Sequence, residues 1–173
     1  MTHTTAAITP SATTNRPSHL ETGLSDAERQ KLAKLLSQVL ADTYVLTIKT
    51  HVYHWNVVGP QFLPLHTLLD DHYNDLFKAA DVVAERIRAL GHFTPNSIQA
   101  MLPSSSVEEE QKSRSADGMI KQLVHDHEQI ARRMRETAAV SEKLDDFVTT
   151  DMLAKRLAFH EKAIWMLRAI IAA

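Results

Sequence analysis

The chain has 173 residues, a hydrophobic content of 44% and a formal net charge of −2 at pH 7, values typical of one ordinary globular domain. It contains no cysteine, which excludes disulfides, cysteine-based zinc sites and thiol catalysis. No apolar stretch approaches the roughly 20 residues that span a bilayer, and the N-terminus lacks the basic and apolar regions of a secretory signal peptide. We therefore expect no membrane association and a cytoplasmic location.

The first predicted elements are a tail and a long helix. Residues 1–24 are rich in Thr, Ser and Pro and show no apolar period, so we expect a flexible N-terminal tail followed by one domain over 25–173. Ser25 and Glu28 form a capping-box pattern that begins the first helix. Gly59, which is followed by proline, ends it.

The second helix is expected over 61–90, where leucine, alanine and valine recur at helical spacing. The connection that follows, over 92–106, is too long for a tight turn and is expected to contain a short helix over 97–102. Ser106 and Glu109 form another capping-box pattern, which predicts that the third helix begins there.

The third helix is expected to end near residue 139, and the fourth helix follows Asp146. One long connection therefore crosses from the second helix to the third. This order predicts an all-α, ferritin-like four-helix bundle with a short helix in the connection between helices 2 and 3.

Two histidines and three carboxylates lie within 32 residues at the end of the first helix and along the second. They are His54, His66, Asp70, Asp81 and Glu85. At about 100° per residue, the last four share one helix face within an arc of about 100°. Along the axis, however, Asp70 and Asp81 stand ~16.5 Å apart, whereas metal–donor distances are about 2 Å. One chain therefore holds two half-sites, one formed by His66 with Asp70 and the other by Asp81 with Glu85.

An antiparallel copy of the helix across a two-fold axis would complete both half-sites, giving two identical sites per dimer. His54 would join the first half across the turn at Gly59. The plainer interpretations are a solvated acidic face for Asp81 and Glu85 and an ordinary partly buried histidine for His66. Like charges four residues apart destabilise a helix slightly, so the combination of five such residues favours a metal site.

The same stretch contains the motif His-Trp-x-x-x-Gly-x-x-Phe, followed at fixed spacing by the other candidate ligands and an arginine. The motif residues are His54, Trp55, Gly59 and Phe62, and those that follow are His66, Asp70, Asp81, Glu85 and Arg86. From Ile48 to Leu90 the sequence resembles the Dps family of miniferritins, the DNA-binding proteins from starved cells.

The resemblance implies that the five candidate ligands form an inter-subunit ferroxidase centre, with Trp55 beside it. It further implies a hollow homododecamer that oxidises Fe²⁺, preferentially with hydrogen peroxide, and deposits ferric mineral inside. Glu85 would be the bridging carboxylate, and Trp55 would intercept stray oxidising equivalents. Iron is thus the expected metal, which suits carboxylate and imidazole ligands.

Other metal centres are not predicted. No Glu-x-x-His pair occurs, which argues against a centre inside one bundle, and the second helix has no methionine that could bind haem, so no haem is expected. His51 and His54 could share a zinc ion, but the family gives a role only to the latter. His125 and His127 point about 200° apart on a helix and are expected to be ordinary surface or interface histidines, and Trp165 is expected in the core.

Three aspartates, Asp145, Asp146 and Asp151, lie at or near the start of the fourth helix. Capping and compensation of the helix dipole explain them without a further function. The alternative is a pore, since shells of the Dps family have acidic three-fold pores near this part of the chain and rings of carboxylates guide cations.

DNA binding is where the chain departs from the family. Residues 1–25 contain one arginine, Arg16, and no lysine, and no basic extension follows Arg168. Clustered cations are needed to neutralise phosphates, so we do not expect DNA binding.

Two alternatives to a ferroxidase remain. The first is a nucleoid-associated structural protein with secondary metal binding, which the absence of a basic tail disfavours. The second is a shell occupied by zinc, because zinc binds such ligands more strongly than Fe²⁺ does.

Overall fold

The computed structural model describes residues 20–109 and 114–172, and helices are the only regular secondary structure within these ranges. The elements are α1 (Asp26–Asn56), α2 (Phe62–Ala89), α3 (Ile98–Met101), the 3₁₀ helix η1 (Leu102–Ser104), α4 (Ala116–Lys143) and α5 (Phe147–Ile170). The expected short helix in the connection is therefore present as α3 and η1. The all-α class is confirmed.

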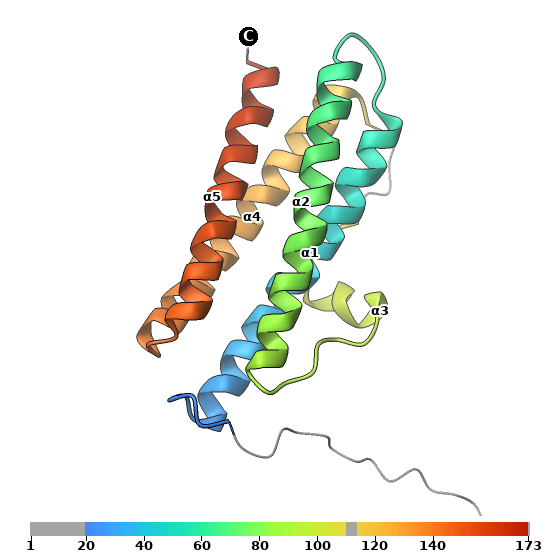
Figure 1. The fold of residues 1–173 in the computed structure, drawn as a ribbon. Helices are drawn as coiled ribbons and strands as arrows, with labels where there is room; N and C mark the ends of the chain where they lie inside the picture. Colours follow the sequence, from blue (N-terminus) through green and yellow to red (C-terminus); the bar gives the residue numbers. More distant parts are fainter. Residues whose placement is uncertain (1–19, 110–113, 173) are drawn as a thin grey trace, which may run out of the picture.

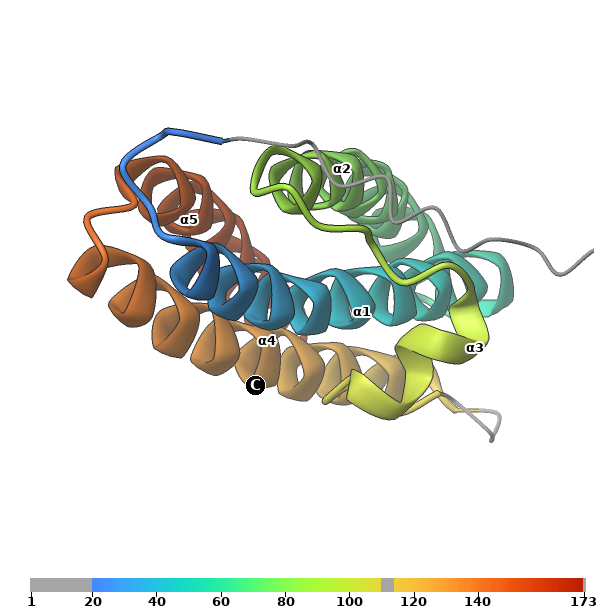
Figure 2. The ribbon, with the colours of Figure 1, turned by 90° about the horizontal axis from the view of Figure 1, so that it is seen from below.

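The four long helices form two antiparallel hairpins, α1 with α2 and α4 with α5 (Figure 1). The hairpins are joined through contacts between α1 and α4, which run side by side in the view from below (Figure 2). The connection that contains α3 crosses from the end of α2 to the start of α4 (Figure 1). This confirms the expected four-helix bundle with one long crossover.

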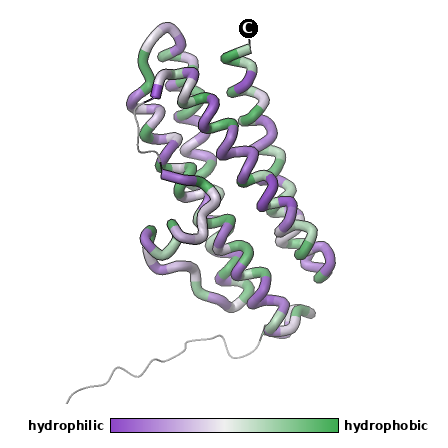
Figure 3. The backbone as a smooth tube through the Cα atoms, turned by 180° about the vertical axis from the view of Figure 1, so that it is seen from behind, coloured by the Kyte–Doolittle hydropathy of each residue, from purple (hydrophilic) through white to green (hydrophobic). Residues whose placement is uncertain are grey.

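Hydrophobic and hydrophilic residues alternate along the long helices (Figure 3). The amphipathic helices α2 and α4 bury one face in the shared core, whereas α1 packs against both of them and is buried on most sides over residues 39–50. Fully buried side chains of three long helices, such as Leu36 of α1, Leu69 of α2 and Leu123 of α4, belong to that core. Within the described ranges, no helix is both long enough and apolar enough to cross a membrane. Trp165 does not join the core, because 67% of its surface is exposed; the sequence-based expectation for it was wrong.

Local signals define the ends of α1 and α2 as expected. Ser25 Oγ accepts a hydrogen bond from the Glu28 N–H, and the Ser25 N–H donates to the Glu28 carboxylate at 2.7 Å, which is the predicted capping box. Gly59 turns the chain between α1 and α2 at a φ of 101°. Gly91, at a φ of 86°, ends α2 in a Schellman motif, in which the N–H of the next residue, His92, reaches the Ile87 carbonyl at 3.2 Å.

The third long helix does not begin where the sequence pattern predicted. α4 starts at Ala116, with Ser115 as its N-cap, and ends at Lys143. Ser106 is not a cap; its backbone N–H and its hydroxyl donate to the Asp42 carboxylate at 2.5 and 3.0 Å. Arg133 of α4 also donates to Asp42, at 2.9 Å. A tertiary anchor that holds the crossover to α1 and α4 thus replaced the expected local capping box.

The expected N-terminal tail falls mostly on residues 1–19, which lie outside the described residues. Its last part, Leu20 to Leu24, lies against the bundle. Arg29 Nη1 donates to the Leu20 carbonyl at 3.1 Å and also bonds the Leu24 carbonyl, and the Leu24 side chain packs against the core. The described bundle therefore begins a few residues before the predicted boundary.

Candidate metal centre

The first half-site lies where the end of α1 meets the start of α2. The buried His54 ring stacks on the His66 ring, with centroids 3.8 Å apart and an interplanar angle of 19°. His54 Nδ1 lies 2.8 Å from the His66 carbonyl oxygen, and His66 Nδ1 lies 2.9 Å from the His54 carbonyl oxygen. Because a carbonyl only accepts hydrogen bonds, each Nδ1 is the donor. The Nε2 of each neutral ring therefore keeps the lone pair that binds a metal ion.

Asp70 lies one helical turn after His66, on the same face of α2. The Tyr73 hydroxyl donates to Asp70 Oδ1 at 2.6 Å, and the Asn74 side-chain amide donates to the Asp70 backbone carbonyl at 2.9 Å and more weakly to Asp70 Oδ2 at 3.4 Å. The aspartate is half-buried, so these contacts restrict its orientation. Hydrogen bonds to a carboxylate are the kind of outer contact that orients metal ligands.

The second half-site, Asp81 and Glu85, lies further along α2, and both side chains are exposed. Since α2 is unbroken, its rise separates Asp70 from Asp81 by ~16.5 Å. Within residues 20–109 and 114–172 of one chain, no three His, Asp or Glu side chains come together as a metal-binding group. One chain therefore keeps the two halves apart, as the sequence predicted.

Trp55 and His51 lie beside the first half-site on α1. The two rings are 4.1 Å apart, and His51 also stacks on Tyr73 of α2, with centroids 4.0 Å apart. Trp55 is 62% exposed in the single chain. The structure thus places Trp55 close to the candidate ligands and places His51 in an aromatic stack that the sequence did not indicate.

The three pore candidates differ in their surroundings. Asp146 is buried; both its carboxylate oxygens accept hydrogen bonds from Arg86 Nη2, at 2.7 and 2.8 Å, and its side chain caps α5 at Thr149. Burial acts to raise the pKa of Asp146, but the hydrogen bonds from Arg86 and Thr149 outweigh it and lower the pKa. Asp146 is thus a cap and an ion-pair partner, and its burial contradicts the pore interpretation for this residue. Asp145 and Asp151 are exposed, and Asp151 accepts a hydrogen bond from Lys155 at 2.6 Å.

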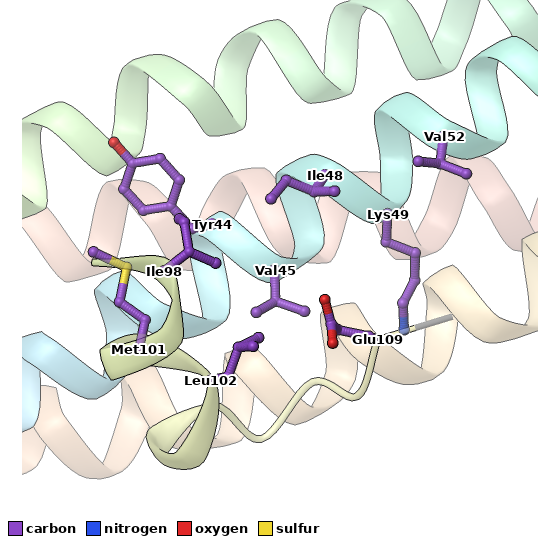
Figure 4. Close-up of a pocket in the computed structure, with 9 residues that line it drawn as sticks. All are labelled: Tyr44, Val45, Ile48, Lys49, Val52, Ile98, Met101, Leu102 and Glu109. Carbon is purple, nitrogen blue, oxygen red and sulfur yellow. The ribbon is translucent and has the colours of Figure 1, made fainter. Parts of the chain in front are cut away.

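Two hollows accompany these residues. A groove of about 560 Å³ lies between α2 and α5, and both Glu85 and Asp151 line it. A smaller pocket of about 100 Å³ lies between α1 and the crossover (Figure 4). Its lining is mainly apolar, and its lysine, Lys49, forms a buried ion pair with Asp126 at 2.6 Å. Of the five candidate ligands, Glu85 lines the groove, and none lines the pocket.

Three buried histidines in the bundle core were missed in the sequence. His127 and His160 are fully buried, with their Nδ1 atoms 2.8 Å apart, and the ring of His72 lies 5.9 Å from that of His127. Burial lowers the pKa of His72 to about 4 and that of His160 to about 3, and it also lowers the pKa of His127. His127 is therefore not the surface histidine that we expected. Its spacing from Leu123 and Ile130, four and three residues away, is the signal that would have placed it in the core.

Comparison with known proteins agrees with this architecture. A family model for the ferritin-like domain matches residues 33–173. A low temperature-induced protein of Nostoc is 42% identical over 151 residues, covering 86% of this chain and 84% of that protein. The DNA protection during starvation protein 2 of Bacillus anthracis is 32% identical over 142 residues, covering 82% of this chain and 97% of that protein.

A solved structure extends the agreement to three dimensions. The Dps protein of Vibrio cholerae O1, described as a member of a broad superfamily of ferritin-like diiron-carboxylate proteins, superposes with a TM-score of 0.82. It is 28% identical, and the match covers 86% of this chain and 94% of that one. The sequence matches and the shared bundle lead to one conclusion: this chain belongs to the Dps family of ferritin-like proteins.

Proposed function

We propose that the protein oxidises Fe²⁺ with hydrogen peroxide at centres shared between two subunits and stores the ferric product inside a hollow dodecamer. The observation that carries the proposal is the reciprocal pair of hydrogen bonds between His54 and His66, which leaves both Nε2 atoms available to a metal ion. Asp70 supplies a carboxylate to the same half-site. Imidazole together with carboxylate suits Fe²⁺.

An exposed apolar surface supports the pairing of two copies of α2. Phe77 stands within about 20° of His66 around the helix, and it is 62% exposed in the single chain. Phe62, one turn before His66, is 43% exposed. Exposed aromatic side chains on the face that bears the ligands favour contact with a partner. An isologous contact would bring the histidines of each subunit to Asp81 and Glu85 of the other.

The test of this function is the variant Asp81→Ala/Glu85→Ala, given Fe²⁺ without oxygen and then hydrogen peroxide. We expect fast formation of ferric absorbance in the wild type and its loss in the variant, because these residues are the carboxylates of the second half-site. Helix stability should not suffer, since the variant removes a like-charge pair. Size-exclusion chromatography should show the same assembly for both proteins.

The matched control removes two exposed glutamates from another helix, in the variant Glu136→Ala/Glu142→Ala on α4. This control changes the net charge by the same amount and should retain the wild-type rate. Wild-type initial rates in an assembled Asp81→Ala/Glu85→Ala protein would rule out the assignment.

Relatives carry the name of DNA protection, and we propose that here protection comes from removing iron and peroxide and not from coating DNA. We expect negligible retention of duplex DNA in a gel shift near neutral pH and about 150 mM salt, because the shell has a net negative charge and few clustered cations. Three of the ten histidines, His72, His127 and His160, are buried with lowered pKa values, so they add no charge under mild acid either. A salt-resistant shift at neutral pH would show this expectation to be wrong.

The exposed aspartates near α5 are proposed to guide cations toward the centre. Asp151 and Glu85 line the same groove between α2 and α5, and carboxylates along a hollow attract cations. Asp145 lies exposed in the turn before α5. Asp146 is left out of this role because Arg86 already neutralises it.

A further inference from the structure

Tyr73 links the two helices that supply the first half-site. Its ring stacks on His51 of α1, with centroids 4.0 Å apart and an interplanar angle of 19°. It also meets the His54 ring edge-on, with centroids 5.3 Å apart, and its hydroxyl donates to Asp70 Oδ1 at 2.6 Å. This one side chain of α2 therefore contacts a candidate ligand from each helix.

The two carboxylate oxygens of Asp70 have different surroundings. Oδ1 accepts the short hydrogen bond from Tyr73, whereas the contact of Oδ2 with the Asn74 side-chain amide is long, at 3.4 Å. The first distance is that of a strong hydrogen bond to a carboxylate, and the second exceeds the usual range. Oδ2 is therefore the oxygen that a metal ion can take with the smaller loss of hydrogen bonding.

Helix geometry and packing fix the position of the Tyr73 hydroxyl. Tyr73 lies three residues after Asp70, so the two side chains are neighbours on the surface of α2. The His51 ring packs against the Tyr73 ring from α1, and Tyr73 is partly buried. Because the packing holds the ring, the donor is already in place when a metal ion binds.

The carboxylates of the second half-site lack such support. Asp81 and Glu85 are exposed, and within residues 20–109 and 114–172 no hydrogen bond or ion pair holds either side chain. Asp70 is therefore the one of the three candidate carboxylates whose orientation is set by a neighbour in the same chain.

We propose that Tyr73 is a positioning residue, which holds Asp70 by Oδ1 and so makes it a metal ligand through Oδ2 alone. The proposal rests on the metal centre proposed above and adds a residue that acts through a ligand and is not itself one. Carboxylates bind metal ions through one oxygen or through two. Restricting Asp70 to one oxygen leaves open a coordination position that the second oxygen would fill, and a catalytic metal centre needs such a position for its substrate.

The test measures binding of Co²⁺, used in place of Fe²⁺ and without oxygen, to the assembled full-length protein. Tyr73→Phe keeps the ring and its stack but removes the hydroxyl. Its affinity for Co²⁺ should fall about tenfold or more, because loss of an outer contact to a metal ligand typically costs roughly 10- to 100-fold in affinity. The visible absorption spectrum of the bound Co²⁺ should also change, because Oδ1 becomes free to bind.

Tyr44→Phe is the matched control. It removes the hydroxyl of another partly buried tyrosine, which lies on α1 beside the crossover and away from the half-site (Figure 4). This variant should bind Co²⁺ with the affinity and the spectrum of the wild type.

A double-mutant cycle shows whether Tyr73 acts through Asp70. Asp70→Ala should itself weaken Co²⁺ binding, and adding Tyr73→Phe to it should weaken binding no further, because the two residues act as a unit. If Tyr73 only supported the packing of α1 on α2, Tyr73→Phe would lower the affinity equally with and without Asp70.

The outcomes separate the positioning role from the proposed centre. Co²⁺ binding that is unchanged or tighter in Tyr73→Phe would overturn the positioning role, and so would an equal loss of affinity in the Asp70→Ala background. The proposed centre would stand after either result, provided that Asp70→Ala weakens binding. If Asp70→Ala bound Co²⁺ as tightly as the wild type does, the proposed centre would be wrong, and the role of Tyr73 would be lost with it.

Discussion

Two inactive variants of this protein should regain activity when they are assembled together. One variant lacks the first half-site, through replacement of His54, His66 and Asp70 by Ala, and the other lacks Asp81 and Glu85. Each alone should be inactive, because every two-fold interface then lacks the same half of both sites. After the two are unfolded and co-assembled in equal amounts, about half of the dimers should be mixed if pairing is random.

A mixed dimer contains one site with both halves removed and one site with both halves intact. Roughly a quarter of all sites should therefore recover, as measured by the initial rate of ferric formation. Wild-type protein carried through the same unfolding and reassembly gives the initial rate that corresponds to recovery of all sites. A lack of recovery in well-formed mixed shells would contradict the composite centre, because a site within one subunit gains nothing from mixing.

The sequence predicted the bundle well because its signals are local. The capping box at Ser25 and the turn at Gly59 each act within a few residues and appear where they were expected, and Gly91 ends α2 directly after the range expected for that helix. The separation of the two half-sites followed from helix rise alone. Such features depend little on what lies far away in the chain.

The misses came from tertiary contacts. Ser106 carried a convincing capping pattern, but Asp42 of α1, 64 residues away, accepts its hydrogen bonds instead. Asp146 was a pore candidate by composition, but it forms an ion pair with Arg86 of α2, 60 residues away, so its charge is not available to cations. The stack of His51 on Tyr73 joins two helices, so spacing along either helix could not reveal it.

The buried histidines should make the protein unusually sensitive to acid. His72, His127 and His160 are neutral in the folded chain because burial lowers each pKa, to about 4 for His72 and to about 3 for His160. The unfolded chain binds a proton at each histidine once the pH falls below about 6.5. Stability is therefore fully present above that pH and is lost progressively as the pH falls from 6.5 toward 4.

The size of this loss of stability follows from the thermodynamic linkage between proton binding and folding. At pH 5, a buried histidine that stays neutral when folded costs about 2 kcal/mol of stability, so His72 and His160 together cost about 4 kcal/mol, and His127 adds to this loss. For a domain of this length, such a loss lowers Tm by on the order of 10–20 °C. The difference in Tm between about pH 7.5 and pH 5, measured by thermal unfolding, tests this prediction. The protein concentration is kept the same at both pH values, because assembly also stabilises the fold.

The variant His127→Leu/His160→Leu tests which groups are responsible. It removes both partners of the hydrogen bond between the rings, a change that can be nearly neutral at pH 7.5. It should remove most of the loss at pH 5, leaving that due to His72. The control is His125→Gln, because His125 is exposed on the same helix and its replacement should leave the pH dependence unchanged. If the double leucine variant lost as much Tm at pH 5 as the wild type, His127 and His160 would not be the source of the acid sensitivity.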